Sequence, residues 1–160
     1  MRNAVWMGAA VLLATGCAAL VPGTSREADV ISRFGQPAEQ RQLPDGGRVL
    51  DFPRAPSGHE NWRVILGADG IVRGVEQLLD DEHFARIKPG MPMDEVKRAL
   101  GRHGEYSAFP ALSEEVFSWR YLEFGNRRMF FNAHFDGTGR LKYTSRTEEP
   151  IPNSDNSGSL

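Results

Sequence analysis

The sequence predicts an α+β protein built from two tandem repeats, each with short helices packed on an antiparallel three-strand meander. One copy opens at Pro22 and Gly23, and the other opens at Pro89 and Gly90. Each then continues with acidic residues, an apolar pair one helical turn apart and a further glycine. Three runs of β-type residues with glycine-rich turns follow in each copy. This repetition is the observation on which the fold class depends.

The helix of the first copy is expected to end before Gly35, a residue that readily takes the positive φ of a helix stop. Thr24 and Glu27 have the spacing of a capping box at its start. Val30 and Phe34 lie one turn apart and therefore share a face. A helix this short is marginal by itself, so we expect it to pack against a sheet.

The helix of the second copy is expected to end before Gly101. Pro92 suits the first helical position, and Asp94 is favourable in the first turn beside the positive end of the helix dipole. Val96 and Leu100 repeat the apolar pair of the first copy. A third, shorter helix is expected at residues 81–86, where Asp80, Asp81 and Glu82 are interpreted as a cap and first-turn acids rather than a metal or acid–base cluster.

Six strands are expected, with a glycine-containing hairpin turn inside each copy at residues 67–70 and 136–139. Their ranges are 48–52, 62–66, 71–79, 117–122, 129–135 and 140–146. Aromatic residues alternate with other residues in the fourth strand, and we interpret Trp119 and Phe131 as sheet core rather than a binding surface. Phe130 falls on the opposite face, where an exposed ring would be a candidate for partner contact.

The second copy carries a set of motif residues at fixed places in this pattern. They are Ile87-Lys88-Pro89-Gly90-Met91, Val96, Leu100-Gly101, Trp119-Arg120-Tyr121 and Phe135-Asp136-Gly137-Thr138-Gly139. In these residues the chain resembles the SmpA/OmlA (BamE) outer-membrane lipoprotein family, whose fold is related to that of tandem-repeat β-lactamase inhibitor proteins. The resemblance implies an accessory factor of β-barrel assembly. The family's subunit has a single such domain, whereas this chain has a tandem form.

The N-terminal segment ends at Cys17, the only cysteine of the chain. Arg2 precedes an apolar run at residues 4–14, and the small residues Thr15 and Gly16 come directly before the cysteine. This segment resembles a bacterial lipoprotein signal, which implies cleavage after residue 16 and lipid attachment at Cys17. Ala18 implies, by the same resemblance, the periplasmic face of the outer membrane. The alternative is an uncleaved anchor at residues 4–21, near the lower length limit of a spanning helix.

The sequence therefore divides into a signal, a short lipidated tether, two repeats and a tail. The expected ranges are 1–16 for the signal, 17–20 for the tether, 21–79 for the diverged first repeat, 80–148 for the second repeat and 149–160 for the tail. The tail contains two prolines and almost no apolar residues, so we expect it to be disordered.

Composition and motifs favour a protein without catalysis, cofactor or metal. The net charge is −2, which gives no reason to expect nucleic acid as a partner. The four histidines lack paired metal-ligand spacing, and no Gly-x-Ser-x-Gly motif occurs. We expect a membrane-bound accessory factor that is attached through lipid on Cys17 and binds proteins, with the β-barrel assembly complex as the implied partner. An inhibitor-type or regulatory module for an envelope enzyme is the alternative, and a ligand site between the two sheets is a third interpretation.

Overall fold

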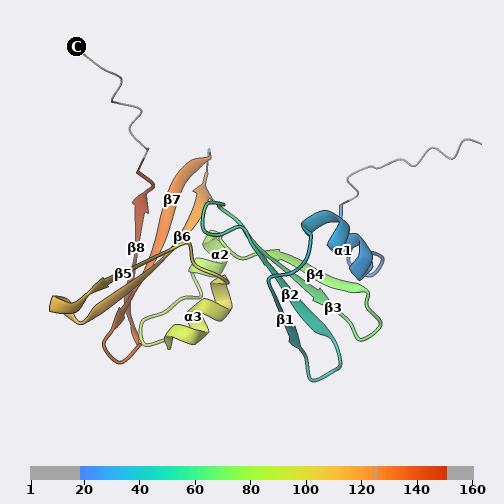
Figure 1. Ribbon diagram of the computed structural model, residues 1–160, viewed down its shortest axis with the longest axis horizontal. Helices are drawn as coiled ribbons and strands as arrows, with labels where there is room; N and C mark the ends of the chain where they lie inside the picture. The colour runs from blue at the N-terminus through green and yellow to red at the C-terminus, as the bar shows by residue number, and fades with distance from the viewer. Residues whose placement is uncertain (1–18, 125, 151–160) are drawn as a thin grey trace, which may run out of the picture.

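The computed structural model of the protein describes residues 19–124 and 126–150. The expected signal, Cys17 and residues 151–160 of the expected tail lie outside this part of the chain. The described residues form an α+β structure with two four-stranded antiparallel sheets, each preceded by short helices. Figure 1 shows α1 on one side of the first sheet, with α2 and α3 between the two sheets.

The two units have the same order of elements. The first contains α1 (Glu27–Phe34), β1 (Glu39–Gln42), β2 (Arg48–Pro53), β3 (Asn61–Leu66) and β4 (Val72–Gln77). After α2 (Asp81–Phe84), the second contains α3 (Met93–Leu100), β5 (Glu105–Phe109), η1 (Pro110–Leu112), β6 (Glu114–Glu123), β7 (Arg127–Asp136) and β8 (Leu141–Glu148). Both sheets keep their strands in chain order, β1-β2-β3-β4 and β5-β6-β7-β8.

The backbone hydrogen bonds that join each helix segment to the last strand of its sheet are also repeated. Gly23 N donates to Val72 O at 2.8 Å, and Gly90 N donates to Leu141 O at the same distance. Each sheet has a register shift between its third and fourth strands. These matched details indicate two copies of one structural unit.

Helix α1 begins later than the expected cap. Its N-cap is Arg26, whose backbone N–H donates to the Asp29 carboxylate at 2.8 Å, so the expected capping box of Thr24 and Glu27 is wrong. The physical reason is that Arg26 forms a β-bridge with the chain before β4, which holds it in an extended conformation. The Glu27 carboxylate instead pairs with Arg48 of β2, with an N–O distance of 2.9 Å.

Helix α3 agrees more closely with expectation. Pro92 was expected at the first helical position but is the N-cap, so the helix begins one residue later, at Met93. Gly101 follows the helix with a φ of 74°, and Gly35 follows α1 with a φ of 82°, as the two glycine stops required. Val96 and Leu100 are fully buried against the second sheet.

Each sheet has one strand more than the sequence predicts. All four residues of β1 are exposed and polar, and all five residues of β5 are exposed. Such edge strands are held by backbone pairing with β2 and β6. Strand β1 has no apolar residue, and β5 is short and buries neither face although Tyr106 and Ala108 alternate with polar residues. The expectation of three-strand meanders is therefore corrected to four-stranded sheets.

The two hydrophobic cores lie under the two helices. The first contains Val30, Leu50, Phe52, Val64, Leu66 and Val72, and the second is formed around Trp119, Tyr121, Phe131 and Phe135. Trp119 and Phe131 are in the core, as predicted. Phe130 is on the other face but is only 6% exposed, because the Arg120 guanidinium lies 5.1 Å from its ring centre. The condition under which Phe130 would be a candidate for partner contact, an exposed ring, is therefore not met.

Candidate binding site between the two units

The two units are joined by hydrogen bonds from β3 to the end of α3. The buried Asn61 side chain donates to Leu100 O at 2.7 Å and to Arg102 O at 2.9 Å. Arg63 of the same strand donates to Arg98 O at 2.8 Å. The last carbonyls of a helix lack partners within that helix, so these side chains satisfy acceptors that would otherwise need water.

A second junction lies in the loop between β2 and β3, close to Asn61 in the chain. His59, in the loop before β3, is 2.7 Å from a carboxylate oxygen of Glu149, the first residue of the expected tail. Glu149 also pairs with Arg120 of β6 at 3.0 Å, and Arg120 in turn donates to Pro56 O. The first unit is thus held to the second at two places along the sheets.

Asp51 forms an ion-pair cluster on the face of the first sheet that points toward α3. Its carboxylate is 2.7 Å from Arg63 Nε and 3.2 Å from Arg41 Nη2. The residue is only 8% exposed, so its charge is stabilised by these two guanidinium groups. The same contacts orient Arg63 toward the carbonyl of Arg98.

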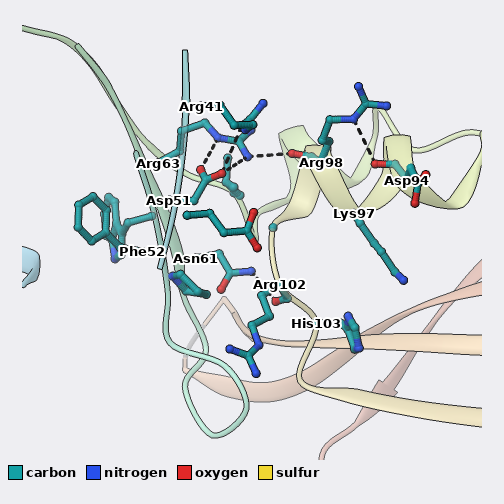
Figure 2. Close-up of a pocket in the computed structure, with 15 residues that line it drawn as sticks. Arg41, Asp51, Phe52, Asn61, Arg63, Asp94, Lys97, Arg98, Arg102 and His103 are labelled. Atoms are coloured by element: carbon teal, nitrogen blue, oxygen red, sulfur yellow. Dashed lines mark hydrogen bonds and ion pairs between the residues drawn. The ribbon is translucent and has the colours of Figure 1, made fainter. Parts of the chain in front are cut away.

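A pocket of about 540 Å³ opens between this face and the end of α3 (Figure 2). Its wall comes from β1, β2 and β3 on one side and from α3 and the loop before β5 on the other. The volume lies in the range of sites that hold small molecules, about 300–1,000 Å³. Charged residues line much of this pocket, so it is not an apolar cavity.

Positive charge exceeds negative charge in the pocket wall. Figure 2 shows that the charged side chains gather around the space between β2 and α3. The cations are Arg41, Arg63, Lys97, Arg98 and Arg102, and the carboxylates are Glu39, Asp51 and Asp94. Since Asp51 is already shared by two arginines, the surplus is concentrated on the α3 side.

His103 lies on this positive side. Its ring packs edge-on against Phe117 with 4.8 Å between the ring centres. Burial lowers the pKa of His103, and the nearby charges of Lys97 and Arg102 lower it further. Lys97 Nζ is 3.9 Å from the centre of the same Phe117 ring, so the lysine and the histidine share one aromatic support.

The four histidines of the sequence occupy four separate places. His103 lines the pocket, and the other three each contact a carboxylate. Those pairs are His59 with Glu149, His83 with Asp80, and His134 with Glu114. Within residues 19–124 and 126–150, no group of three or more His, Cys, Asp or Glu side chains could hold a metal ion.

The acidic run before α2 has the structural role expected of it. Asp80 is the N-cap and accepts a hydrogen bond from His83 N at 2.9 Å. Asp81 and Glu82 lie in the first turn, and Asp81 pairs with Arg146 of β8 at 2.7 Å. The interpretation as a cap and first-turn acids is confirmed.

The second sheet carries a polar row that sequence spacing could not show. Ser145 Oγ is 3.0 Å from His134 Nε2, and His134 Nδ1 is 2.8 Å from Glu114 Oε1. Lys142 also pairs with Glu114, and Tyr143 stacks on the imidazole at 4.2 Å. The order of groups resembles that of a serine hydrolase triad, but hydrolysis also needs oxyanion donors and a substrate pocket. The row lies on the sheet face opposite α3, so we interpret it as a network that ties β6, β7 and β8 together.

Large apolar side chains are exposed along β5 and η1, at the outer edge of the second sheet. Tyr106 is 50% exposed, Phe109 46% and Leu112 67%. Within the described part of the chain, strand β5 pairs only with β6, so its other edge presents free backbone groups. No partner-binding residue was predicted here, because β5 was not among the expected strands.

Comparison of the chain with protein-family models, with curated proteins and with solved structures gave no match. In the part of the chain that the structure describes, no helix is long and apolar enough to cross a membrane.

Proposed function

We propose that this protein is a non-catalytic lipoprotein of the outer membrane that faces the periplasm and binds protein partners in envelope or β-barrel assembly. The observation that carries the binding role is the free edge of β5, with exposed Tyr106, Phe109 and Leu112 beside it. Cys17, with its lipobox-like context, supplies the proposed attachment to the membrane.

The β5 edge has the two properties that strand addition requires. Its free N–H and C=O groups can pair with an extended segment of a partner, and the neighbouring apolar side chains can bury surface against it. Strand β1 is the matching edge of the first sheet, but all its residues are polar or charged. Two similar edges therefore differ in the apolar surface they offer, which favours β5 as the binding edge.

The proposed partner follows from the resemblance of the second unit to the SmpA/OmlA (BamE) family. The order of a helix followed by an antiparallel sheet in both units is compatible with that resemblance. A lipid on Cys17 would raise the local concentration of the protein near an integral barrel complex. The alternative partner is an envelope enzyme that is inhibited or regulated by the two-unit structure.

Site-specific photocrosslinking of the full-length protein in its native bacterium tests this proposal. A photoreactive residue at Phe109 or Leu112 is expected to capture subunits of the β-barrel assembly complex, identified by mass spectrometry. The same residue at Gln40, on the matching polar edge strand, is the control and should capture none of them. Recovery of an envelope enzyme without any assembly subunit would replace this function with the inhibitor-type alternative.

The membrane attachment has its own test, the substitution Cys17→Ser. We expect the variant to leave the membrane fraction and to keep the circular dichroism spectrum and melting temperature of the folded domain. Retention of the variant in the membrane fraction would favour an uncleaved anchor instead.

The absence of catalysis is tested at the polar row of the second sheet. The purified protein is expected to hydrolyse p-nitrophenyl acetate no faster than the variant Ser145→Ala. Hydrolysis that is lost in this variant, with the fold intact, would contradict the non-catalytic proposal.

A further inference from the structure

Three cations of the pocket have no carboxylate partner among the described residues, namely Lys97, Arg98 and Arg102, and of these Arg98 donates to the backbone carbonyl of Asp94. Among the described residues, neither Lys97 nor Arg102 lies within 4.0 Å of a carboxylate oxygen, whereas Arg41 and Arg63 share Asp51. The ammonium group of Lys97 lies over the ring of Phe117 in a cation–π contact. The N–H donors of its ammonium group that are not directed at this ring are available for a ligand.

The surroundings of His103 give a second indication of uncompensated positive charge. The pKa of this imidazole is lowered first by burial and then by Lys97 and Arg102, and none of the described carboxylates counteracts them. A bound anion would reverse that electrostatic effect. The pocket, at about 540 Å³, has room for a ligand much larger than a water molecule.

We propose that this pocket binds a small, multiply charged anion of the phosphate or polycarboxylate class, held by Lys97 and Arg102. The two side chains come from α3 and from the loop after it, so they approach the ligand from the second unit. The first unit closes the opposite wall through Asn61 and Arg63, which are held to the end of α3 by hydrogen bonds. The site therefore exists only where the two units meet, and it does not depend on a protein partner at β5.

Binding is expected to depend on pH through His103. The groups around this imidazole are Lys97 from α3, Arg102 from the same loop, and the uncharged rings of Phe117 and Trp119 from β6. Across the pocket lie Glu39, Arg41, Asp51 and Arg63 of the first sheet, with Asp94 and Arg98 of α3. An anion stabilises protonated His103, so ligand binding should raise its pKa and should weaken as the pH rises through that raised value.

The experiment is an NMR titration of the His103 ring in the full chain with inorganic pyrophosphate and, separately, with citrate. It is carried out at about 0.15 M salt, where surface charges are largely screened. Either probe is expected to raise the pKa of His103 and to bind more tightly at lower pH. A response to pyrophosphate alone would assign a phosphate ligand, and a response to citrate alone would assign a polycarboxylate.

Matched variants show whether the two cations form the site. The double substitution Lys97→Gln and Arg102→Gln is expected to weaken binding at least tenfold and to raise the pKa of His103 in the free protein. Lys88→Gln, an exposed charge change outside the pocket, should leave both quantities unchanged. An unchanged pKa of His103 at millimolar concentrations of both probes, or equal weakening in Lys88→Gln, would overturn the proposal. The wild-type titration decides the matter even if the double variant does not fold.

Discussion

The two units of the protein share a backbone plan but differ in the size of their cores. The first core has six buried residues, whereas the second has thirteen. Strands β6 and β7 are ten residues long, compared with six for β2 and β3. The glycines at the last hairpin turn nevertheless have nearly the same φ, 74° at Gly70 and 75° at Gly139.

This difference shows which features of the unit are essential and which can vary. The backbone hydrogen bond from Gly23 or Gly90 to the last strand of its sheet occurs in both copies, because it fixes where the helix crosses the sheet. The size of the core varies because longer strands simply add layers of side chains. The smaller first unit gains further support from Asn61 and Arg63, which bind the end of α3.

The largest expected effect comes from removing the central tryptophan of the larger core. Trp119 is 1% exposed and donates through Nε1 to Gly101 O at 2.9 Å. Trp119→Ala is expected to lower the free energy of unfolding by about 3–5 kcal/mol. Trp62→Ala, in the smaller core, should cost about 1–2 kcal/mol because that ring is only partly buried. Urea unfolding measures both, and equal losses would contradict the comparison.

A middle-sized effect is expected at the junction of the units. Asn61→Ala removes two donors from the carbonyls of Leu100 and Arg102, and the loss should be about 1–3 kcal/mol. Hydrogen exchange should then become faster in the first sheet than in the second. Gln40→Ala, on an exposed edge strand, is the control and should stay within about 0.5 kcal/mol of wild type. Equal acceleration in both sheets would argue against a dependence of the first unit on the second.

The smallest effect is expected at the matching turn carboxylates. The Thr138 hydroxyl and then the backbone N–H of Arg140 lower the pKa of Asp136, and the backbone N–H of Ile71 lowers that of Asp69. A carboxyl group whose pKa is lower in the folded state stabilises the fold at pH values above its unfolded pKa of about 4. This contribution is lost as the pH falls toward the folded pKa. The melting temperatures of Asp136→Asn and Asp69→Asn should therefore approach that of wild type as the pH falls from 6 to about 3. A difference that grows on acidification would contradict this sign.

Much of each unit was predictable because its signals are local. The apolar pair of Val96 and Leu100, the stop at Gly101 and the alternation around Trp119 each depend on residues close together in the chain. The errors arose where a distant segment decided the outcome. Arg26 caps α1 because a bridge to the chain before β4 holds it. The burial of Phe130, which the sequence left open, likewise involves Arg120 of the neighbouring strand.

The amino-acid sequence alone determined that the protein is α+β, that its body is duplicated and that its glycine turns close hairpins, because these properties follow from spacing within short segments. Only the tertiary structure decided that β1 and β5 complete the sheets, since these short, fully exposed strands are held by backbone pairing with a neighbouring strand. The pocket beside His103 and the polar row of Ser145, His134 and Glu114 also became visible only in the tertiary structure, because their residues are distant in the chain. Such groups meet only when the strands and helices of a unit are packed, so no spacing in the sequence records them.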